Sequence, residues 1–149
     1  MKKQTLSIRI VYAGFALWFG LIGCGLFNRT TINDLKTESQ TVDMDTATSA
    51  RVQIEFQVGD LKIENGANSL MDASFRYNMD NLQPQVKYSE NGEQGELVIS
   101  QQALERIPLG GQLINEWSIQ LANDIPIDLS IQTGAGNADL GLDALDLRI

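Results

Sequence analysis

The sequence predicts an all-β protein, built as a stacked, β-solenoid-like domain that follows an N-terminal signal segment. From Arg51 onward, apolar and polar residues alternate with the period of two that is typical of half-buried strands, first in Val52–Val58. A second segment, Ile127–Gly134, shares with Val52–Gly59 the pattern aliphatic-x-aliphatic-x-apolar-Gln-x-Gly. A strand and a glycine corner in each unit of about 20 residues indicate solenoid rungs, which bury their apolar faces by stacking.

The first 23 residues have the parts of an export signal. Three basic residues precede or enter an apolar run of roughly 14 residues, and small residues stand at its exit. The run ends in Leu-Ile-Gly-Cys, which resembles a bacterial lipobox, whose cysteine receives a diacylglycerol before cleavage. We therefore expect residues 1–23 to be a lipoprotein signal peptide, with lipobox residues Leu21, Ile22 and Gly23 and lipidation on Cys24.

Two other interpretations of this segment remain open. The apolar stretch extends to Phe27, which gives about 18 residues, the lower limit for an uncleaved membrane-spanning anchor. A lone cysteine such as Cys24 is also often a small buried hydrophobic residue. The lipobox and the uncleaved anchor both predict an extracytoplasmic protein of the cell envelope, held at a membrane through the lipid on Cys24 or through the apolar anchor.

Charge and composition exclude several functions. The chain has 11 basic and 19 acidic residues, and removal of residues 1–23 takes away three basic residues and no acidic ones, which leaves a net charge of −11. Such a protein repels nucleic acid and anionic lipid headgroups. Cys24 is the single cysteine and histidine is absent, so a disulfide framework, a Cys/His metal cluster and a Ser-His-Asp triad are impossible. We expect no enzyme activity and no catalytic, metal-binding or cofactor-binding residues.

Residues 24–50 are polar and show no sustained period, so we expect a tether that leads into a short strand at Thr41–Met44. A β domain over residues 51–149 follows. Asn65-Gly66 and Asn91-Gly92 predict turns. Leu70-Met71 is expected to form one helical turn, and Gln101–Asn115 a loop. The expected apolar strand faces are Val52–Val58, Leu61–Ile63, Ala73–Tyr77, Val86–Tyr88, Leu97–Ile99, Trp117–Leu121 and Ile127–Ile131.

The last residues resemble the start of a further rung. Leu145–Ile149 repeats the aliphatic alternation 18 residues after Ile127. A chain that stops inside a rung has no cap, so we expect the domain to be incomplete. Otherwise another surface covers its open end, for example by end-to-end β stacking with an envelope protein partner.

Seven segments of the chain match one family pattern in the same order: Ser39–Val42, Val52–Ile63, Ala73–Asn78, Pro84–Tyr88, Asn115–Leu121, Ile125–Leu129 and Gly134–Gly136. Together they resemble the toast-rack domain of bacterial envelope proteins, a family related to cell-wall-active antibiotic response proteins. The resemblance covers about residues 35–149 and implies stacked β-structure, often extended by further glycine-cornered rungs. It departs at Val58-Gly59, where family members tend to carry Gly-Ala-Gly.

The resemblance implies a lipid-anchored scaffold or interaction module of the cell envelope, as an accessory to envelope-stress signalling. The family's molecular function is largely unassigned, so the resemblance implies no catalytic residue. An alternative is a glycan- or ligand-binding module, in which Trp117 and Tyr77 stack on sugar rings. Both residues stand on the apolar phase of their strands, which favours packing in the core instead.

The Gly134-Ala-Gly136 turn carries little evidence of ligand chemistry. A dinucleotide fingerprint needs a third glycine where Asp139 stands, so a phosphate loop is excluded. A calcium turn has the pattern Gly-x-Gly-x-Asp, but Asp139 stands one residue too far from Gly136. Asp139 and Asp143 remain calcium candidates only because carboxylates at turns suit hard cations. A wall-polysaccharide enzyme, the least favoured hypothesis, needs two carboxylates with separated pKa values. The acidic candidates Asp128, Asp139, Asp143 and Asp146 are expected on an exposed face, and the glycines as rung corners.

Overall fold

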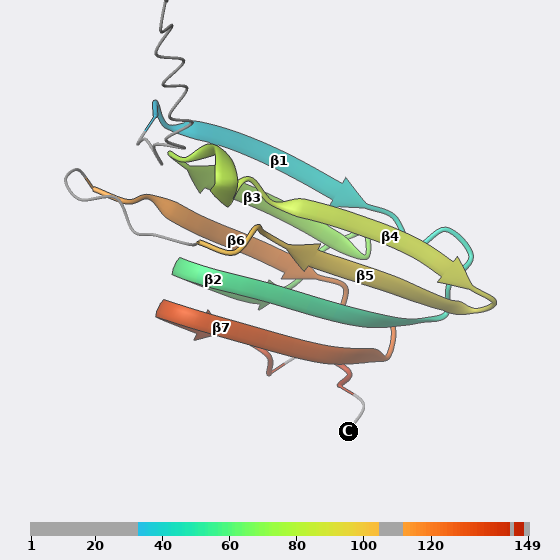
Figure 1. The fold of residues 1–149 in the computed structure, drawn as a ribbon. Helices are drawn as coiled ribbons and strands as arrows, with labels where there is room; N and C mark the ends of the chain where they lie inside the picture. Colours follow the sequence, from blue (N-terminus) through green and yellow to red (C-terminus); the bar gives the residue numbers. More distant parts are fainter. Residues whose placement is uncertain (1–32, 105–111, 144, 148–149) are drawn as a thin grey trace, which may run out of the picture.

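The computed structural model describes residues 33–104, 112–143 and 145–147. Within these ranges one seven-stranded sheet runs in the order β1-β3-β6-β2-β5-β4, and β7 also pairs with β2 (Figure 1). The all-β prediction is confirmed. The strands are β1 (Lys36–Val42), β2 (Ser49–Asn65), β3 (Met71–Tyr77), β4 (Gln85–Asn91), β5 (Gln94–Ser100), β6 (Asn115–Leu121) and β7 (Ile127–Leu140), with a 3-10 turn, η1, at Asp80–Leu82.

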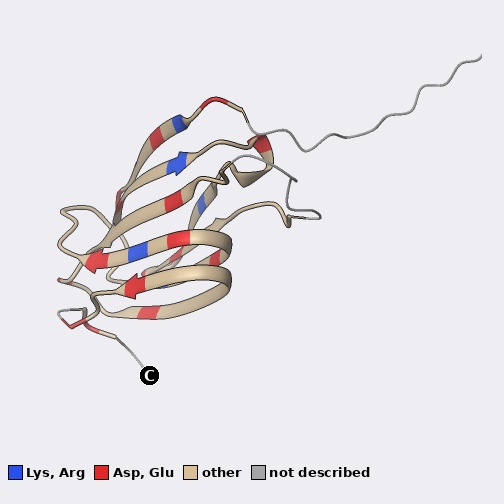
Figure 2. Ribbon diagram, turned by 90° about the vertical axis from the view of Figure 1, so that its left-hand side faces the viewer, with Lys and Arg blue, Asp and Glu red and all other residues tan. Residues whose placement is uncertain are grey.

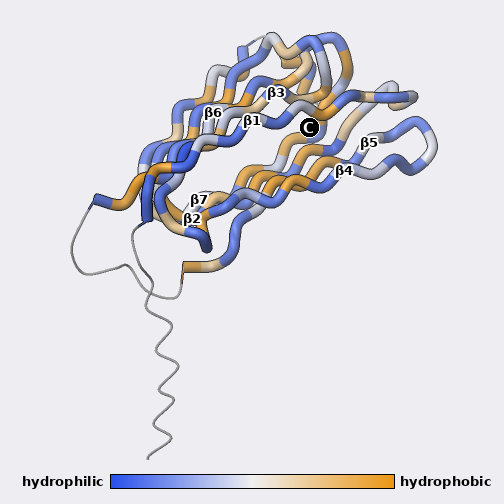
Figure 3. Tube along the Cα trace, turned by 90° about the horizontal axis from the view of Figure 1, so that it is seen from above, coloured by the Kyte–Doolittle hydropathy of each residue, from blue (hydrophilic) through white to orange (hydrophobic). Residues whose placement is uncertain are grey.

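The sheet is folded into two walls, because β2 and β7 each bend in the middle. The first arm of β2 pairs in parallel with β5, whereas its second arm pairs in parallel with β6. β7 follows β2 along both arms in parallel register. One wall therefore contains β1, β3, β6 and the second arms, and the other contains β4, β5 and the first arms. Figures 2 and 3 show the bent strands and the two layers from the side and from above.

The core lies between the two walls and is formed by the alternate apolar residues of each strand. Trp117 of β6 is at its centre, in edge-to-face contact with Phe56 and Phe75, whose ring centroids lie 5.0 and 5.4 Å away. Alternation places these side chains inward and their polar neighbours on the outer faces. A second, smaller cluster consists of Tyr77, Met79 and Leu82, at the end of the core near η1.

The first strand lies further toward the N-terminus than the sequence indicated. We expected Thr41–Met44, but β1 spans Lys36–Val42 and pairs with β3 in antiparallel register. Residues 36–42 and the start of β2 thus belong to the sheet within the range expected to be a tether. The polar sequence of this edge strand has no apolar period to reveal it, and its partners lie far along the chain, as in the 2.7 Å hydrogen bond from Thr41 Oγ1 to Asp72 Oδ1.

The internal repeat is real, but its register differs from the sequence pattern by two residues. The pattern aligns Val52 with Ile127, whereas the structure pairs Val52 with Leu129. A shift of two keeps every side chain on the same face, so alternation cannot detect it. The next rung also starts two residues later than expected, since Ile127 bridges in parallel to Leu147 rather than to Leu145.

Two other local predictions have different outcomes. The helical turn expected at Leu70-Met71 is wrong, because Met71 begins β3 and both side chains are fully buried in the core. The turn at Asn91-Gly92 is confirmed as the β4–β5 hairpin, with Gly92 at a φ of 65°.

The apolar run of residues 10–27, including lipobox residues Leu21, Ile22 and Gly23 and the lipidation site Cys24, lies outside the described residues.

Candidate functional site

Among the residues that the structure describes, one isolated bridge pairs with the outer edge of β7, which we call its open edge. Within the described residues, β7 pairs with β2 on one side and with Leu147 alone on the other. The Pro126 carbonyl accepts a hydrogen bond from the Ala50 amide of β2. On the opposite side, the Ile127 amide donates to the backbone carbonyl of Asp146 at 2.7 Å. Because backbone groups alternate along a strand, Leu129 and Ile131 also direct their amides to the open edge.

A column of backbone carbonyls makes glycine obligatory at the corner of each rung. A Cβ on Gly59 would overlap the Asn115 carbonyl oxygen, and a Cβ on Gly136 would overlap the carbonyl oxygen of Gly59. Both glycines have a positive φ, 121° and 137°. Gly134 is confined in the same way by the Gln57 carbonyl. The rung-corner interpretation of Gly134 and Gly136 is therefore confirmed, and the steric reason is the close approach of stacked backbones.

The family departure at Val58-Gly59 has a structural counterpart. Val58 pairs with Ala135 and Gly59 with Gly136, so the two corners coincide despite their different sequences. Below the first corner lies a buried polar cluster in which Asn115 Nδ2 donates to the Val58 carbonyl at 2.5 Å and to Gln101 Oε1 at 3.1 Å. Asn115 Oδ1 also accepts from Trp117 Nε1 at 3.2 Å. These bonds attach the corner of β2 to the start of β6.

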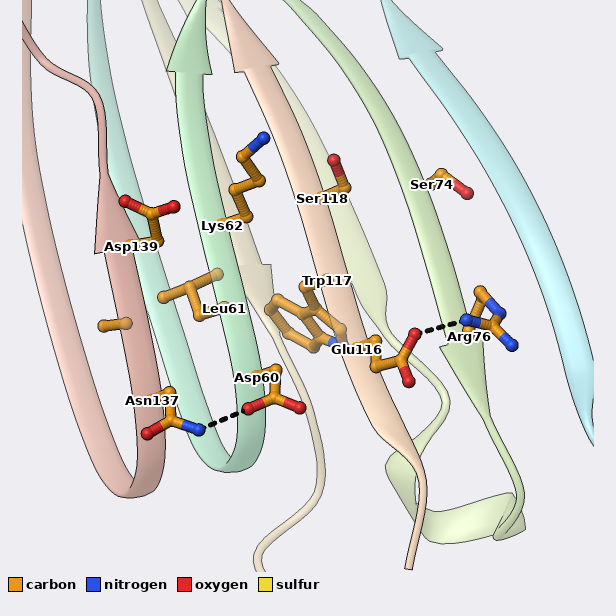
Figure 4. Close-up of a pocket in the computed structure, with 11 residues that line it drawn as sticks. Asp60, Leu61, Lys62, Ser74, Arg76, Glu116, Trp117, Ser118, Asn137 and Asp139 are labelled. Atoms are coloured by element: carbon orange, nitrogen blue, oxygen red, sulfur yellow. Dashed lines mark hydrogen bonds and ion pairs between the residues drawn. The ribbon is translucent and has the colours of Figure 1, made fainter.

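A groove of about 360 Å³ lies on the outer face of the wall that contains β3, β6 and the second arms of β2 and β7 (Figure 4). We call it the outer-face groove. Its polar lining consists of two cross-strand rows, each with one residue from each of the four strands. One row is Arg76, Glu116, Asp60 and Asn137, and the other is Ser74, Ser118, Lys62 and Asp139.

Both cations of the outer-face groove, and its carboxylates Asp60 and Glu116, are paired with neighbours. Arg76 Nη1 lies 2.5 Å from Glu116 Oε2, and Asn137 Nδ2 donates to Asp60 Oδ1 at 2.8 Å. Lys62 Nζ lies 2.8 Å from Glu64 Oε1, and this hydrogen bond raises the pKa of the Lys62 ammonium above its usual value. The groove therefore presents oriented polar groups of both signs without an unpaired cation.

The acidic residues considered in the sequence lie apart from one another. Asp128 accepts a hydrogen bond from Arg51 Nε at 3.0 Å on the outer face of the opposite wall. Asp139 lines the outer-face groove beside Lys62. Asp143 and Asp146 are exposed after β7. Within the described ranges, no group of three or more His, Cys, Asp or Glu side chains is placed to hold a metal ion.

The two aromatic candidates are in the core, as their strand phase predicted. Trp117 and Tyr77 are each 1% exposed, so neither offers a face to a sugar ring. The Tyr77 hydroxyl donates to the Glu38 carboxylate, and burial together with this carboxylate raises the pKa of the hydroxyl. None of the helices in the described part of the chain is long and apolar enough to span a membrane.

The sequence did not reveal the outer-face groove. Its residues come from four segments between Asp60 and Asp139, and each segment alone shows only the polar half of an ordinary alternating strand. The groove becomes recognisable only from the strand pairing, which places Arg76 opposite Glu116 and Lys62 opposite Asp139. Opposite charges at facing positions are a usable cross-strand signal once strand order is known.

Comparison with known proteins agrees with this architecture. A family model described as the N-terminal domain of toast_rack matches residues 31–149, whereas no curated protein matches the sequence significantly. Among solved structures, the chain is similar to "a putative cell adhesion protein" from Clostridium sporogenes, with a TM-score of 0.73 and 29% sequence identity. The alignment covers 77% of this chain and 55% of that chain, so the chain spans about half the length of its neighbour. The chain belongs to the toast-rack family and contains its N-terminal domain.

Proposed function

We propose that this protein is an interaction module of the cell surface, held at a membrane by a lipid on Cys24, and that the open edge of β7 accepts an added parallel strand, either a further rung of the same polypeptide or a segment of a partner. The description of the clostridial neighbour as "a putative cell adhesion protein" supports a surface role. The export signal and lipobox support the anchor. An accessory role in envelope-stress signalling, which the family resemblance implies, would make the partner an envelope signalling protein.

The observation that carries this proposal is the open edge itself. Unpaired strand edges bind extended segments by adding a strand, with backbone bonds providing affinity and side chains providing specificity. The parallel bridge between Ile127 and Leu147 shows the strand direction that this edge accepts. Leu140, at the end of β7, leaves 43% of its surface exposed where an added strand would cover it.

The proposal also implies a sequence pattern for a suitable added strand. It needs a glycine opposite Gly136, because the carbonyl column leaves no room for a Cβ. It needs aliphatic residues opposite Leu129 and Ile131, and basic or polar residues opposite Asp128 and Asp139. β2 follows the same pattern on the other side of β7, where Arg51 is paired with Asp128 and Lys62 stands opposite Asp139.

A peptide of residues 49–65, the β2 sequence, is therefore expected to bind the full-length protein. The probe supplies Gly59 at the corner and two cations for the acidic positions of β7. The same peptide with Gly59→Val is expected to bind at least about tenfold more weakly, because its corner cannot approach the backbone. Isothermal titration calorimetry measures both affinities.

A matched pair of protein variants locates the binding at the edge. The Gly141 amide donates to the Ile63 carbonyl of β2. Backbone amides alternate between the two sides of a strand, and Ala138 lies three residues before Gly141, so the Ala138 amide faces the open edge. Ala138→Pro removes this donor and spares the ladder to β2, whereas Ala138→Ser retains it. Binding is expected to weaken in the proline variant alone. No binding of the peptide, or equal binding by both variants, contradicts the proposal.

A Cys24→Ser variant tests the anchor. The wild-type protein is expected to incorporate a labelled fatty acid and to accumulate as its uncleaved form in globomycin. The variant should lose the label, because serine lacks the thiol that carries the lipid. Membrane fractionation and mass spectrometry of both proteins make the measurement. An unlabelled wild-type protein that stays in the membrane at full mass would contradict lipidation and favour the uncleaved apolar anchor.

A further inference from the structure

We propose that the outer-face groove binds a neutral, hydroxyl-rich ligand, a saccharide. The groove lies on the outer face of β3, β6, β2 and β7, away from the core, and its lining includes Asn137, Ala138 and Asp139 of β7 (Figure 4). Its volume, about 360 Å³, falls near the lower end of the range of about 300–1,000 Å³ for small-molecule sites. This volume suits one or two sugar rings of a longer chain.

The lining offers planar polar groups at facing positions on neighbouring strands. The guanidinium of Arg76 and the carboxylate of Glu116 form one pair, and the carboxylate of Asp60 and the amide of Asn137 form the next. Each planar group has two atoms in one plane for hydrogen bonding, which matches the two adjacent hydroxyls of a sugar ring. The pairs lie in one row, because Glu116 is opposite both Arg76 and Asp60.

Two serines of the second row present short hydroxyl groups to the groove. Ser74 and Ser118 stand opposite each other on β3 and β6, and Ser118 is exposed. Each hydroxyl can donate one hydrogen bond and accept two. Neighbouring strands lie about 4.8 Å apart, so the serines and Lys62 of the same row present polar groups at a regular spacing across the sheet.

The electrostatics select against charged ligands. The lining carries three carboxylates, Asp60, Glu116 and Asp139, against the two cations Lys62 and Arg76. Both cations are already paired, Arg76 with Glu116 and Lys62 with Glu64, so an anion would have to displace a carboxylate.

The groove is formed before any ligand binds. Its residues stand on four paired strands, and Trp117 and Leu61 pack beneath it at 1% and 2% exposure. Side chains held on a rigid sheet lose little conformational freedom on binding. The burial of Trp117 also removes the stacking that the sequence suggested as a sugar contact, so recognition depends on hydrogen bonds.

Saturation-transfer NMR and calorimetry on the full-length protein in detergent test the proposal with cellotetraose and chitotetraose as neutral probes and tetragalacturonate as the anionic one. We expect at least one neutral tetrasaccharide to bind, and tetragalacturonate to bind at least about tenfold more weakly. Absence of saturation transfer to both neutral probes at millimolar concentration would overturn the proposal. Stronger binding of the anionic probe would overturn it as well.

Two variants place the ligand in the groove. Ser118→Tyr fills the groove from an exposed position, and Ser130→Tyr makes the same change on the outer face of the opposite wall as a control. We expect a loss of saccharide affinity of at least about tenfold in Ser118→Tyr and no loss in Ser130→Tyr. Asp60→Asn preserves the shape and removes a charged acceptor, so it should also weaken binding. Equal affinities in Ser118→Tyr and Ser130→Tyr would refute this location, and unchanged melting temperatures show that the fold is intact.

This site and the β7 edge can fail separately. The saccharide experiments do not depend on the edge, because the groove is complete within β3, β6, β2 and β7. The β2 peptide is expected to bind in the presence of a saturating neutral saccharide. Displacement of the bound peptide by the saccharide would contradict two independent sites.

Discussion

Replacing Gly59 with alanine is expected to destabilise the protein by more than about 4 kcal/mol, enough to unfold most single domains. The new Cβ would overlap the Asn115 carbonyl oxygen, which belongs to backbone and cannot rotate away. The φ of 121° at this position is also unfavourable for any residue with a side chain. Urea unfolding followed by circular dichroism measures the free energy of unfolding.

Gly66→Ala is the matched control for this prediction. Gly66 has a similar φ of 110°, but a Cβ there meets nothing within 4 Å. Its replacement should therefore cost only the conformational strain, about 1–3 kcal/mol. Equal losses in the two variants would mean that φ alone restricts the corner and that the carbonyl column has no role.

Trp117→Ala is expected to cost about 3–5 kcal/mol, the range for removal of a large aromatic side chain from a core. The substitution deletes the edge-to-face contacts with Phe56 and Phe75 and leaves Asn115 Oδ1 without its indole donor. Because Trp117 lies between the two walls, the resulting cavity would weaken the packing of one wall against the other. Thermal and urea unfolding at constant protein concentration measure the effect.

Trp117→Phe separates packing from hydrogen bonding. Phenylalanine retains an aromatic ring between Phe56 and Phe75 but loses the bond to Asn115, so a smaller loss of about 1–3 kcal/mol is expected. If the phenylalanine variant is as unstable as the alanine variant, the buried polar cluster and not the aromatic packing holds the two walls together.

Local chemistry made most of the strands predictable. Alternation in Val52–Val58 and Trp117–Leu121 identified strands, because one face of each is buried. Turn dipeptides identified the hairpin at Asn91-Gly92. The polar edge strand β1 and the buried Leu70-Met71 segment were not predicted, because their conformations depend on partners that lie 29 or more residues away along the chain.

The candidate sites were less predictable than the strands. Gly134 and Gly136 were identifiable as corners, but the carbonyls that confine them belong to another strand. The outer-face groove depends on the pairing of Arg76 with Glu116, and of Asp60 with Asn137, across segments that lie up to 77 residues apart. No local pattern encodes which polar faces will lie side by side.

The sequence by itself determined that the protein is all-β, that glycines form its corners and that Trp117 and Tyr77 lie in the core, because alternation and backbone sterics act over a few residues. Only the tertiary structure decided the register of β7 against β2, the extent of β1 and the meeting of four polar strand faces at the outer-face groove. A shift of two residues leaves every side chain on its own face, so alternation cannot choose between Gly134 and Gly136 as the partner of Gly59; the folded chain pairs Gly59 with Gly136.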